Sequence, residues 1–323
     1  MGAGRVAAIL LAAGKGTRMR TELCKVMHTV LGRPMLAHVI DACRDAGVRD
    51  CFVVVGYGRE AVMAAFAGDA NLHWVHQEQQ LGTGHAVLCC RDSVAGKYDD
   101  VLVLCGDGPL IRSETIRALL DRHHADAAAA TLATAILDDP TGYGRIDRDA
   151  GGGLRGIIEH GDCTDAQRAI REVNPSYYCF RTTDLFAALA DVKPDNQKGE
   201  YYLTDAIAIL TRAGGKVGAI TAVPPQDVFS INSRQDLALV NAVMRDRVND
   251  RLMTGGVTIA DPRSAWIDSR ARIGPDTTIH PFVYIHGAAT IGRGCVIGPF
   301  ASVSGPVALP DGARLEPFSG ARA

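Results

Sequence analysis

Short runs in which every residue is apolar alternate with segments of helical periodicity along the first half of the chain. Residues 6–13, 51–55 and 101–105 form such runs, which are typical of strands buried on both faces of a parallel sheet. Alternating strand and helix patterns predict an α/β domain with a doubly wound, mostly parallel sheet. The other expected strands are 72–75 and 217–223, and the expected helices are 34–46, 59–67, 84–94, 182–190, 202–213, 235–251 and one that begins at Ser113.

The pattern changes from about residue 127 onwards. Strand-like pieces at 130–137, 154–158 and 176–180 are separated by loops such as 138–145. We interpret them as a mixed or antiparallel extension of the sheet, which forms the other wall of a cleft.

An aliphatic residue recurs at every sixth position near the end of the chain. If one residue in four is aliphatic, nine consecutive matches have a chance probability on the order of 10⁻⁶. A hexapeptide repeat of this kind predicts a three-sided parallel β-helix, here with about three coils. The repeated positions are Ile267, Ile273, Ile279, Ile285, Ile291, Ile297, Val303, Leu309 and Leu315, and Gly274, Gly292 and Gly298 follow at expected tight corners.

Length and composition limit the class of protein. At 323 residues the chain suggests about two domains, and we place them at 1–252 and 253–323. The net charge of −2 argues against a nucleic-acid partner. No apolar run reaches the length of a membrane span and no secretory pattern opens the chain, so we expect a cytoplasmic protein without membrane contact. Nine cysteines without a CxxC motif are expected to be buried, reduced thiols.

The loop that follows the first apolar run carries glycines and cations. Gly14 and Gly16 allow a close backbone approach to a ligand, and Arg18 and Lys25 follow them. Backbone amides and cations beyond the carboxyl end of a strand form a phosphate site. The loop is not a dinucleotide fingerprint, because Met19 stands at the third glycine position, nor a P-loop, because Gly-Lys is followed by Gly16. A tight turn with solvated charges is the alternative.

Three segments are expected to meet at the carboxyl ends of the parallel strands, namely 11–25, 77–84 and 105–109. The amide of Gln77 suits the edge of a nucleobase, and the glycines after it allow close backbone contact. Asp107 follows a strand and is expected to hold Mg²⁺ beside phosphate oxygens. Helix capping is the alternative role of this carboxylate.

This set of residues indicates nucleotidyl transfer to a sugar 1-phosphate. The sugar phosphate is already an ionised nucleophile, so the reaction needs alignment and positive charge rather than a general base. Mg²⁺, Arg18 and Lys25 would supply that charge. No convincing nucleophile–base pair stands out, and we expect most histidines to be structural or solvated. Those considered are His28, His85, His123, His124 and His160.

Several motifs carry a family resemblance. LAAGKGTRM (11–19), QLGTGHA (80–86), DDPTGYGRI (138–146) and GEYYLTD (199–205) occur in this order. Together they resemble the uridylyltransferase domain of the bifunctional GlmU family, the UDP-N-acetylglucosamine pyrophosphorylases, over about the first 250 residues. The resemblance implies transfer from UTP to N-acetyl-α-D-glucosamine 1-phosphate with Mg²⁺ as cofactor, in the biosynthesis of a cell-envelope precursor.

The resemblance also implies roles for individual residues. Arg18 and Lys25 would act on the phosphates, and Asp107 and Asn232 would bind Mg²⁺. Leu11, Ala12, Ala13, Gly14, Lys25, Gln77, Gly82, Thr83, Cys105 and Gly106 would contact the nucleotide, and Gly144, Glu159 and Asn174 the sugar. From the residues alone, Glu159 could equally be a solvated acid, Asn174 a turn residue and Asn232 a helix cap.

The chain departs from the family pattern at several positions. Relatives usually have proline at Cys24, valine at Gly108, Thr-Gly at Pro175-Ser176 and glycine at Ser230. They also have a longer left-handed β-helix that binds acetyl-coenzyme A, so with about three coils we expect no acetyltransferase activity here. The short β-helix is expected to mediate oligomerisation, by analogy as a trimer.

Two alternatives to this function remain. The first is the same chemistry on another sugar 1-phosphate or with dTTP. The second is an idle scaffold that only binds a nucleotide sugar, which would be expected to lack Lys25 or Asp107. Both of these residues are present.

Overall fold

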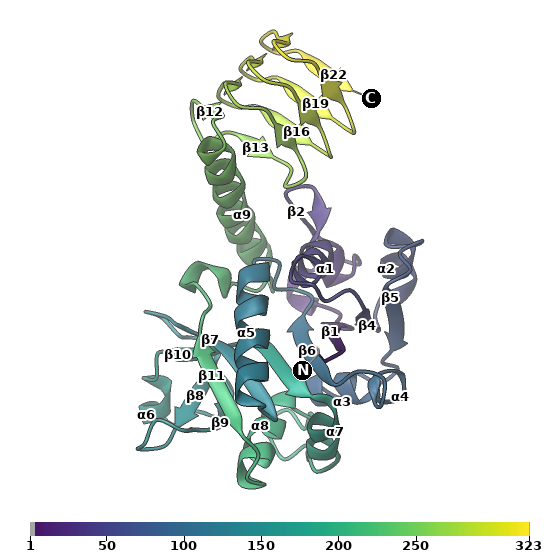
Figure 1. Cartoon of the computed structure of the whole chain (residues 1–323), viewed down its shortest axis with the longest axis vertical. Coiled ribbons are helices and arrows are strands. Elements are labelled where there is room, and N and C mark those ends of the chain that lie inside the picture. The colour runs from purple at the N-terminus through teal and green to yellow at the C-terminus, as the bar shows by residue number, and fades with distance from the viewer. Residues whose placement is uncertain (1–3, 323) are drawn as a thin grey trace. The chain divides into compact units, whose positions relative to one another are not determined.

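The computed structural model describes residues 4–322 and divides into two compact units (Figure 1). The first unit comprises the chain up to residue 27 together with residues 35–232, and the second comprises residues 28–34 and those from 233 onwards. The sequence predicts a boundary at residue 252, where the residue pattern changes. In the structure, the long helix that precedes this residue belongs to the second unit, together with the hexapeptide repeats. No helix among the described residues is long and apolar enough to cross a membrane.

The first unit is built on one mixed sheet with the strand order β11-β7-β10-β6-β1-β4-β5. β1 pairs in parallel with both β4 and β6, as expected from their apolar runs, whereas β10 is antiparallel to β6 and β7. The mixed extension is therefore confirmed. The strands are β1 (Val6–Ala12), β4 (Cys51–Val55), β5 (Leu72–His76), β6 (Asp100–Cys105), β7 (Ala130–Ile136), β10 (Glu172–Arg181) and β11 (Val217–Thr221).

A further strand, β8 (Gly144–Arg148), lies partly where the sequence predicts a loop. It pairs with β9 (Leu154–Ile158) and β10. The prediction of a loop through residue 145 is wrong because Arg145 is almost fully buried and donates to the main-chain carbonyl of Arg168 at 3.4 Å. A buried arginine whose guanidinium reaches a main-chain carbonyl is compatible with a strand, although the charged sequence does not indicate one.

Helices cover the sheet and mostly follow the expected segments. The expected helix at 84–94 is in fact two short helices, α3 and α4, interrupted at Cys89 and Cys90. The helices of the first unit are α1 (Met35–Asp45), α2 (Arg59–Ala65), α3 (Thr83–Leu88), α4 (Arg91–Val94), α5 (Ser113–Asp126), α6 (Asp165–Arg168), α7 (Thr182–Ala190) and α8 (Leu203–Arg212).

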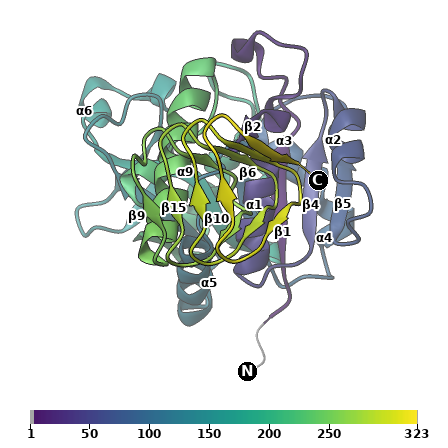
Figure 2. The same ribbon diagram turned by 90° about the horizontal axis from the view of Figure 1, so that it is seen from above.

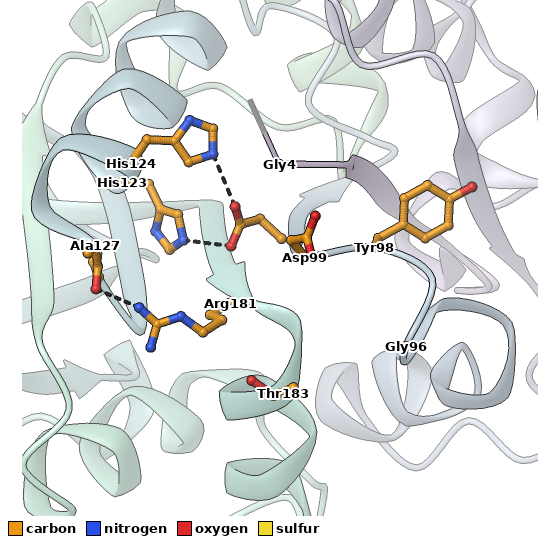
Figure 3. A pocket seen from close by; sticks show the side chains of 11 residues that line it. Gly4, Gly96, Tyr98, Asp99, His123, His124, Ala127, Arg181 and Thr183 are labelled. Carbon is orange, nitrogen blue, oxygen red and sulfur yellow. Dashed lines mark hydrogen bonds and ion pairs between the residues drawn. The ribbon is translucent and has the colours of Figure 1, made fainter. Parts of the chain in front are cut away.

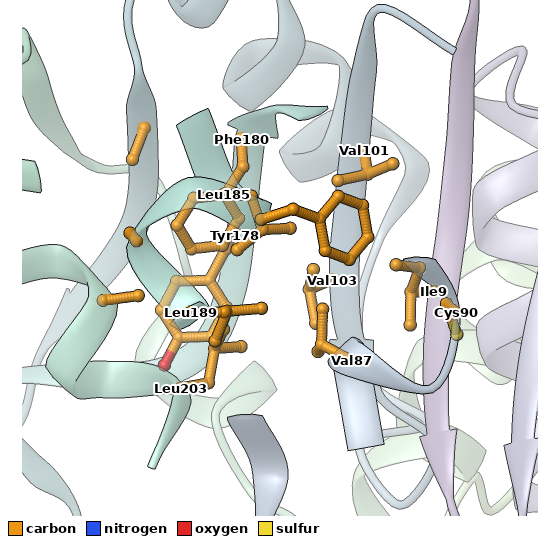
Figure 4. Close-up of a cluster of buried hydrophobic side chains, with 14 of the residues drawn as sticks. Ile9, Val87, Cys90, Val101, Val103, Tyr178, Phe180, Leu185, Leu189 and Leu203 are labelled. Carbon is orange, nitrogen blue, oxygen red and sulfur yellow. The ribbon is translucent and has the colours of Figure 1, made fainter. Parts of the chain in front are cut away.

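The core between this sheet and the helices α3, α7 and α8 is apolar (Figure 4). Ile9 and Val103 project from β1 and β6, Leu185 and Leu189 from α7, and Phe180 from β10. All five are at most 2% exposed. This packing fixes the strand ends from which the loops of the candidate site extend.

The second unit contains the hairpin β2–β3 (Thr29–Val30 and Arg33–Pro34), the helix α9 (Arg234–Thr254) and a left-handed parallel β-helix. α9 begins with a capping box in which Ser233 and Asp236 satisfy each other's main-chain amides. Figures 1 and 2 show the coils of the β-helix from two directions. Its strands are β12 (Thr258–Ile259), β13 (Trp266–Ile267), β14 (Arg272–Ile273), β15 (Thr278–Ile279), β16 (Tyr284–His286), β17 (Thr290–Ile291), β18 (Val296–Ile297), β19 (Ser302–Ser304), β20 (Ala308–Leu309), β21 (Arg314–Leu315) and β22 (Gly320–Arg322).

The hexapeptide prediction is confirmed by the strand register. Ile267 pairs with Ile285 and Ile285 with Val303, so each coil contains three hexads. The strands form three parallel sheets in the orders β12-β15-β18-β21, β13-β16-β19-β22 and β14-β17-β20. The structure therefore holds three complete coils and the beginning of a fourth.

The repeat glycines Gly274, Gly292 and Gly298 do not adopt positive φ angles, so their need for glycine has another cause. A Cβ at Gly274 would instead lie 2.7 Å from the carbonyl carbon of Gly292, and one at Gly298 would lie 2.7 Å from the carbonyl oxygen of Leu315. These glycines are needed because adjacent coils approach each other closely.

Candidate active site

The candidate site begins in the glycine loop after β1. Two short 3₁₀ helices, Thr17–Met19 and Lys25–Met27, follow this loop. Gly16 has a φ of +65°, and a Cβ there would lie 2.8 Å from the Cβ of Lys25. Glycine thus lets the chain fold back so that Lys25 reaches the end of the strand.

A cavity of about 290 Å³ lies beside this loop, at the carboxyl ends of β1 and β6. Nine of the ten residues expected to contact the nucleotide line it, and Gly106 instead donates its amide to the Leu11 carbonyl at 2.9 Å. The nine are Leu11, Ala12, Ala13, Gly14, Lys25, Gln77, Gly82, Thr83 and Cys105, and Asp107 lies beside them. Val26, Gln80, Ala86 and Glu200 also line the cavity, although the sequence did not single them out.

Amide side chains stabilise the wall of this cavity. Gln77 is buried and donates to the carbonyl oxygen of Gly82 at 3.1 Å. Gln80 donates to the carbonyl oxygen of Ala13 at 2.9 Å and so ties the wall to the glycine loop. Gln80 lay within a motif carrying the resemblance, but only the fold shows which carbonyl its amide reaches.

The segment that contains Tyr201 closes the wall from the other side. The Tyr201 amide donates to the Leu81 carbonyl, and the Tyr201 carbonyl accepts from the Gly84 amide, both at 2.8 Å. Gly82 has a φ of +112°, and a Cβ there would lie 2.6 Å from the Tyr201 carbonyl oxygen. The two loops therefore approach as closely as main-chain atoms can.

The two predicted cations and the two predicted metal ligands form one cluster. Lys25 makes an ion pair with Asp107 and donates to Oδ1 of Asn232 at 2.7 Å. Arg18 donates to the same Oδ1 at 2.9 Å. Residues separated by more than 200 positions in the sequence thus meet at one point.

The donor atoms of this cluster suit a hard cation. The ammonium of Lys25 lies between a carboxylate oxygen and an amide oxygen, which are the atoms that Mg²⁺ prefers. Asp107 and Asn232 supply only two ligands, and the described residues contain no group of three or more His, Cys, Asp or Glu side chains arranged for a metal. A cation here would therefore complete its shell with phosphate oxygens and water, which is common for Mg²⁺.

Cys105 lies against this cluster without joining its chemistry. Burial, together with the nearby Asp107 carboxylate, raises the pKa of its thiol to about 12. The side chain therefore remains a neutral thiol at physiological pH, which is neither a strong nucleophile nor a metal ligand.

The three residues predicted to bind the sugar lie together. Asn174 pairs with Gly144 across β10 and β8, and a Cβ at Gly144 would lie 3.7 Å from Oε2 of Glu159. Asn174 is buried and donates to the Tyr178 hydroxyl at 2.6 Å. Burial raises the pKa of Glu159, although its hydrogen bond from Thr204 at 3.1 Å opposes that effect.

Pro175 and Ser176 form part of a β-bulge. The pairing of β10 with β7 shifts between Val173 and Tyr177, and Ser176 has a φ of +66°. Proline is tolerated in a bulge because no ladder hydrogen bond is required of it. The family glycine thus corresponds to a left-handed position, which Ser176 occupies here while its amide donates to Asn174 Oδ1 at 3.1 Å.

A second cavity, of about 680 Å³, lies at the amino end of β6 (Figure 3). Asp100 accepts hydrogen bonds there from His123 at 3.3 Å and from His124 at 3.0 Å, while Arg181 donates to the Ala127 carbonyl at 2.6 Å. Burial raises the pKa of Asp100, but the two histidines outweigh burial and hold the pKa below its ordinary value. These contacts link α5 to the sheet and give both histidines a structural role, one of the two roles expected of most histidines.

Comparisons with known proteins agree with this geometry. Residues 8–206 match the family described as MobA-like NTP transferase domain, and residues 270–305 match the bacterial transferase hexapeptide family (six repeats). The bifunctional protein GlmU of Heliobacterium modesticaldum is 46% identical over 280 residues, which cover 87% of this chain and 61% of that protein. That of Pelotomaculum thermopropionicum is 46% identical over 277 residues, which cover 86% and 60%. The chain thus spans about three fifths of the length of these relatives.

Solved structures confirm the fold of the first unit. A UDP-glucose pyrophosphorylase complexed with UDP-glucose aligns with a TM-score of 0.61 at 15% identity, covering 75% of this chain and 98% of that one. A Bacillus anthracis protein assigned as a glucose-1-phosphate thymidylyltransferase aligns with a TM-score of 0.62 at 20% identity, covering 75% and 96%. The GlmU-like resemblance is confirmed by the relatives, and the chain belongs to the MobA-like NTP transferase domain family.

Proposed function

We propose that this chain transfers the uridylyl group of UTP to N-acetyl-α-D-glucosamine 1-phosphate and releases diphosphate, with Mg²⁺ as cofactor. The observation that carries the proposal is the cluster of Arg18, Lys25, Asp107 and Asn232. Two of its members, Lys25 and Asp107, line the cavity beside the glycine loop. Cations for phosphates and oxygens for a metal converge there on a wall of main-chain amides.

The reaction needs no general base from the protein. An oxygen of the sugar 1-phosphate attacks the α-phosphorus of UTP, a new P–O bond forms, and the bond to the bridging oxygen of diphosphate breaks. Arg18 and Lys25 stabilise the negative charge on the phosphate oxygens and on the leaving group. Mg²⁺ held by Asp107 and Asn232 would neutralise further charge on those oxygens when it is bound.

The cavity wall suits a nucleobase. Gln77 is held by its hydrogen bond to Gly82, so its amide is fixed in position. Gly14 has no heavy atom within 4 Å of the place where a Cβ would stand, so a planar ring can lie against its backbone. Gln80 fixes the Ala13 carbonyl and therefore the shape of the same wall.

The pocket of Gly144, Glu159 and Asn174 suits an N-acetylhexosamine. The Glu159 carboxylate accepts hydrogen bonds from sugar hydroxyls, and the Asn174 amide can both donate and accept. Gly144 allows β8 to pack closely here, because a Cβ at this position would lie 3.0 Å from Cγ2 of Ile157. Relatives named bifunctional protein GlmU and the presence of these three residues favour this sugar.

Two other functions remain as alternatives, and one assay separates them. Release of diphosphate is measured with UTP or dTTP and with a panel of sugar 1-phosphates, with Mg²⁺ and with EDTA. We expect Mg²⁺-dependent release with UTP and N-acetylglucosamine 1-phosphate. Release only with another sugar or with dTTP would correct the specificity, and nucleotide binding without any release would favour a scaffold.

Variants test the site directly. Lys25→Ala removes the cation that contacts both Asp107 and Asn232, and we expect a loss of activity of about 10²–10³-fold. Lys97→Ala is the matched control, since the ammonium of Lys97 donates to the Asp92 carbonyl at 3.3 Å and is not among the residues that line the cavity. Equal activities of the two variants would refute the assigned role.

We also propose that the β-helix mediates self-association, by analogy as a trimer. The rings of Phe282, Phe300 and Phe318 stack at 4.8 and 4.9 Å between centroids and are at least half exposed. An apolar column of this kind on a protein surface is typical of an interaction site. Light scattering of the full chain tests the proposal, and a monomer would contradict it.

A further inference from the structure

The amide of Asn232 has two chemically different ends, and its neighbours determine which end faces the cation cluster. Lys25 and Arg18 lie 2.7 and 2.9 Å from one end. Both side chains are donors without acceptor capacity, so this end is the oxygen. The Nδ2 end then donates to the hydroxyl oxygen of Ser230 at 3.2 Å.

The main chain beneath this amide is already fixed. The amide of Ile231 donates to the carbonyl oxygen of Asp107 at 3.0 Å, and the Ile231 side chain is completely buried. The two predicted metal ligands therefore have a set main-chain separation. The orientation of the Asn232 side chain itself is a separate matter, and Ser230 contacts that side chain directly.

We propose that Ser230 is a positioning residue, whose hydroxyl holds the amide of Asn232 so that Oδ1 is directed at the divalent cation. This inference rests on the metal site of the proposed function. When phosphates draw Lys25 and Arg18 away, the bond from Nδ2 to Ser230 keeps the oxygen in place. A site that is pre-oriented in this way binds its cation without first ordering a side chain.

Glycine, which is usual at this position in the family, has no hydroxyl to offer. The chain therefore holds the same ligand by a side-chain contact that such a sequence lacks. Removing the hydroxyl should weaken cation binding without removing a ligand. The effect should resemble the loss of one hydrogen bond, which corresponds to a roughly three- to ten-fold change in affinity.

Mn²⁺ titration of the full chain followed by electron paramagnetic resonance tests this, with UTP present and no sugar phosphate, so that no turnover occurs. We expect Ser230→Ala and Ser230→Gly to weaken Mn²⁺ binding by about three- to ten-fold and Ser230→Thr, which keeps the hydroxyl, to bind as the parent does. Asn232→Ala should weaken binding more. Circular dichroism and thermal unfolding of each variant report whether it folds.

The double variant Ser230→Ala/Asn232→Ala decides whether Ser230 positions Asn232 or has a general effect on the structure. If Ser230 acts through Asn232, Ser230→Ala should have no further effect on Mn²⁺ affinity in the Asn232→Ala background. In turnover assays the Mg²⁺ concentration for half-maximal rate should rise while kcat at saturating Mg²⁺ stays near that of the parent.

Three results would overturn the inference: unchanged Mn²⁺ affinity in Ser230→Ala, an additive effect in the double variant, or no Mn²⁺ binding by the parent chain. Failure of the proposed function looks different. A parent chain that binds Mn²⁺ and UTP, responds to Ser230→Ala and yet transfers no uridylyl group would refute the function and retain the role of Ser230.

Discussion

Gly82 is where the main chain of the cavity wall is most restricted, and Gly82→Ala should both destabilise the first unit and weaken nucleotide binding. Its φ of +112° and ψ of 177° lie in a region that only glycine occupies readily. A Cβ would lie 2.6 Å from the carbonyl oxygen of Tyr201 and 2.9 Å from its nitrogen. Both atoms belong to the main chain, so a rotamer change cannot relieve the contact.

The magnitude follows from these two effects. The backbone conformation costs a non-glycine residue about 1–3 kcal/mol, and overpacking adds about 1–3 kcal/mol. Alanine recovers about 0.4–1 kcal/mol because it restricts the unfolded chain. We therefore expect a loss of about 1–5.5 kcal/mol in the free energy of unfolding, equivalent to a decrease in Tm of about 2–20 °C.

Gly142→Ala is the matched control. Gly142 has a φ of +88°, but nothing lies within 4 Å of the position of its Cβ. The control also has a positive φ but lacks the clash, so Gly82→Ala should destabilise the first unit by about 1–3 kcal/mol more than Gly142→Ala.

The assay is urea unfolding followed by tryptophan fluorescence. Trp74 lies in the first unit and Trp266 in the second, so a Trp266→Phe background reports on the first unit alone. UTP affinity is measured by calorimetry below the unfolding transition. Equal destabilisation by Gly82→Ala and Gly142→Ala would refute the clash, and unchanged UTP affinity in folded Gly82→Ala would refute the role of this wall in nucleotide binding.

Three further predictions concern stability. Burial raises the pKa of Glu159, so its ionisation opposes folding as pH rises, and Glu159→Gln should increase the Tm at pH 7 with a gain that disappears below about pH 4.5. Asp100→Asn should instead lower the Tm at pH 7, because His123 and His124 hold the Asp100 pKa below its ordinary value despite burial. The ionised Asp100 therefore stabilises the parent at pH 7, and this contribution fades as pH falls below about 4. Parallel Tm–pH curves for a variant and its parent would contradict the prediction for that residue. Thr277 is fully buried and bonds the main chain of the β-helix at 2.9 and 3.1 Å, so Thr277→Val should cost the second unit about 1–3 kcal/mol in urea unfolding, whereas a cost below 0.5 kcal/mol would show that these bonds are not needed.

The regular elements could be predicted because burial imposes a pattern on the sequence. A strand covered on both faces, such as β4 (Cys51–Val55), must be apolar throughout, and its bounds agree with the prediction. The hexapeptide repeat could be predicted for the same reason, since each coil presents one aliphatic side chain per face to the interior. β8 could not be read in this way, because the burial of Arg145 depends on carbonyl groups that other segments supply.

The sequence identified the residues of the candidate site more readily than the contacts between them. Motif order and strand ends pointed to Lys25 and Asp107, but no local pattern encodes the hydrogen bonds that bring Asn232 to them. Gln80 shows the same limit, because its role depends on the Ala13 carbonyl that the fold places beside it. Contacts between a side chain and a distant main-chain atom leave no periodic trace in the sequence.

The departures from the family pattern change side chains but leave the main-chain contacts of the candidate site in place. Cys24 offers its carbonyl to the Met27 amide at 2.9 Å, a bond that proline would make equally. A Cβ at Gly108 would lie 3.6 Å from the Tyr177 hydroxyl, an ordinary contact, so the main chain is compatible with a larger residue there. Ser176 retains the left-handed conformation that glycine adopts readily. A site that depends on main-chain positions thus tolerates changes of side chain around it, which is why the cation cluster and the pocket that we propose for the sugar remain assembled despite these substitutions.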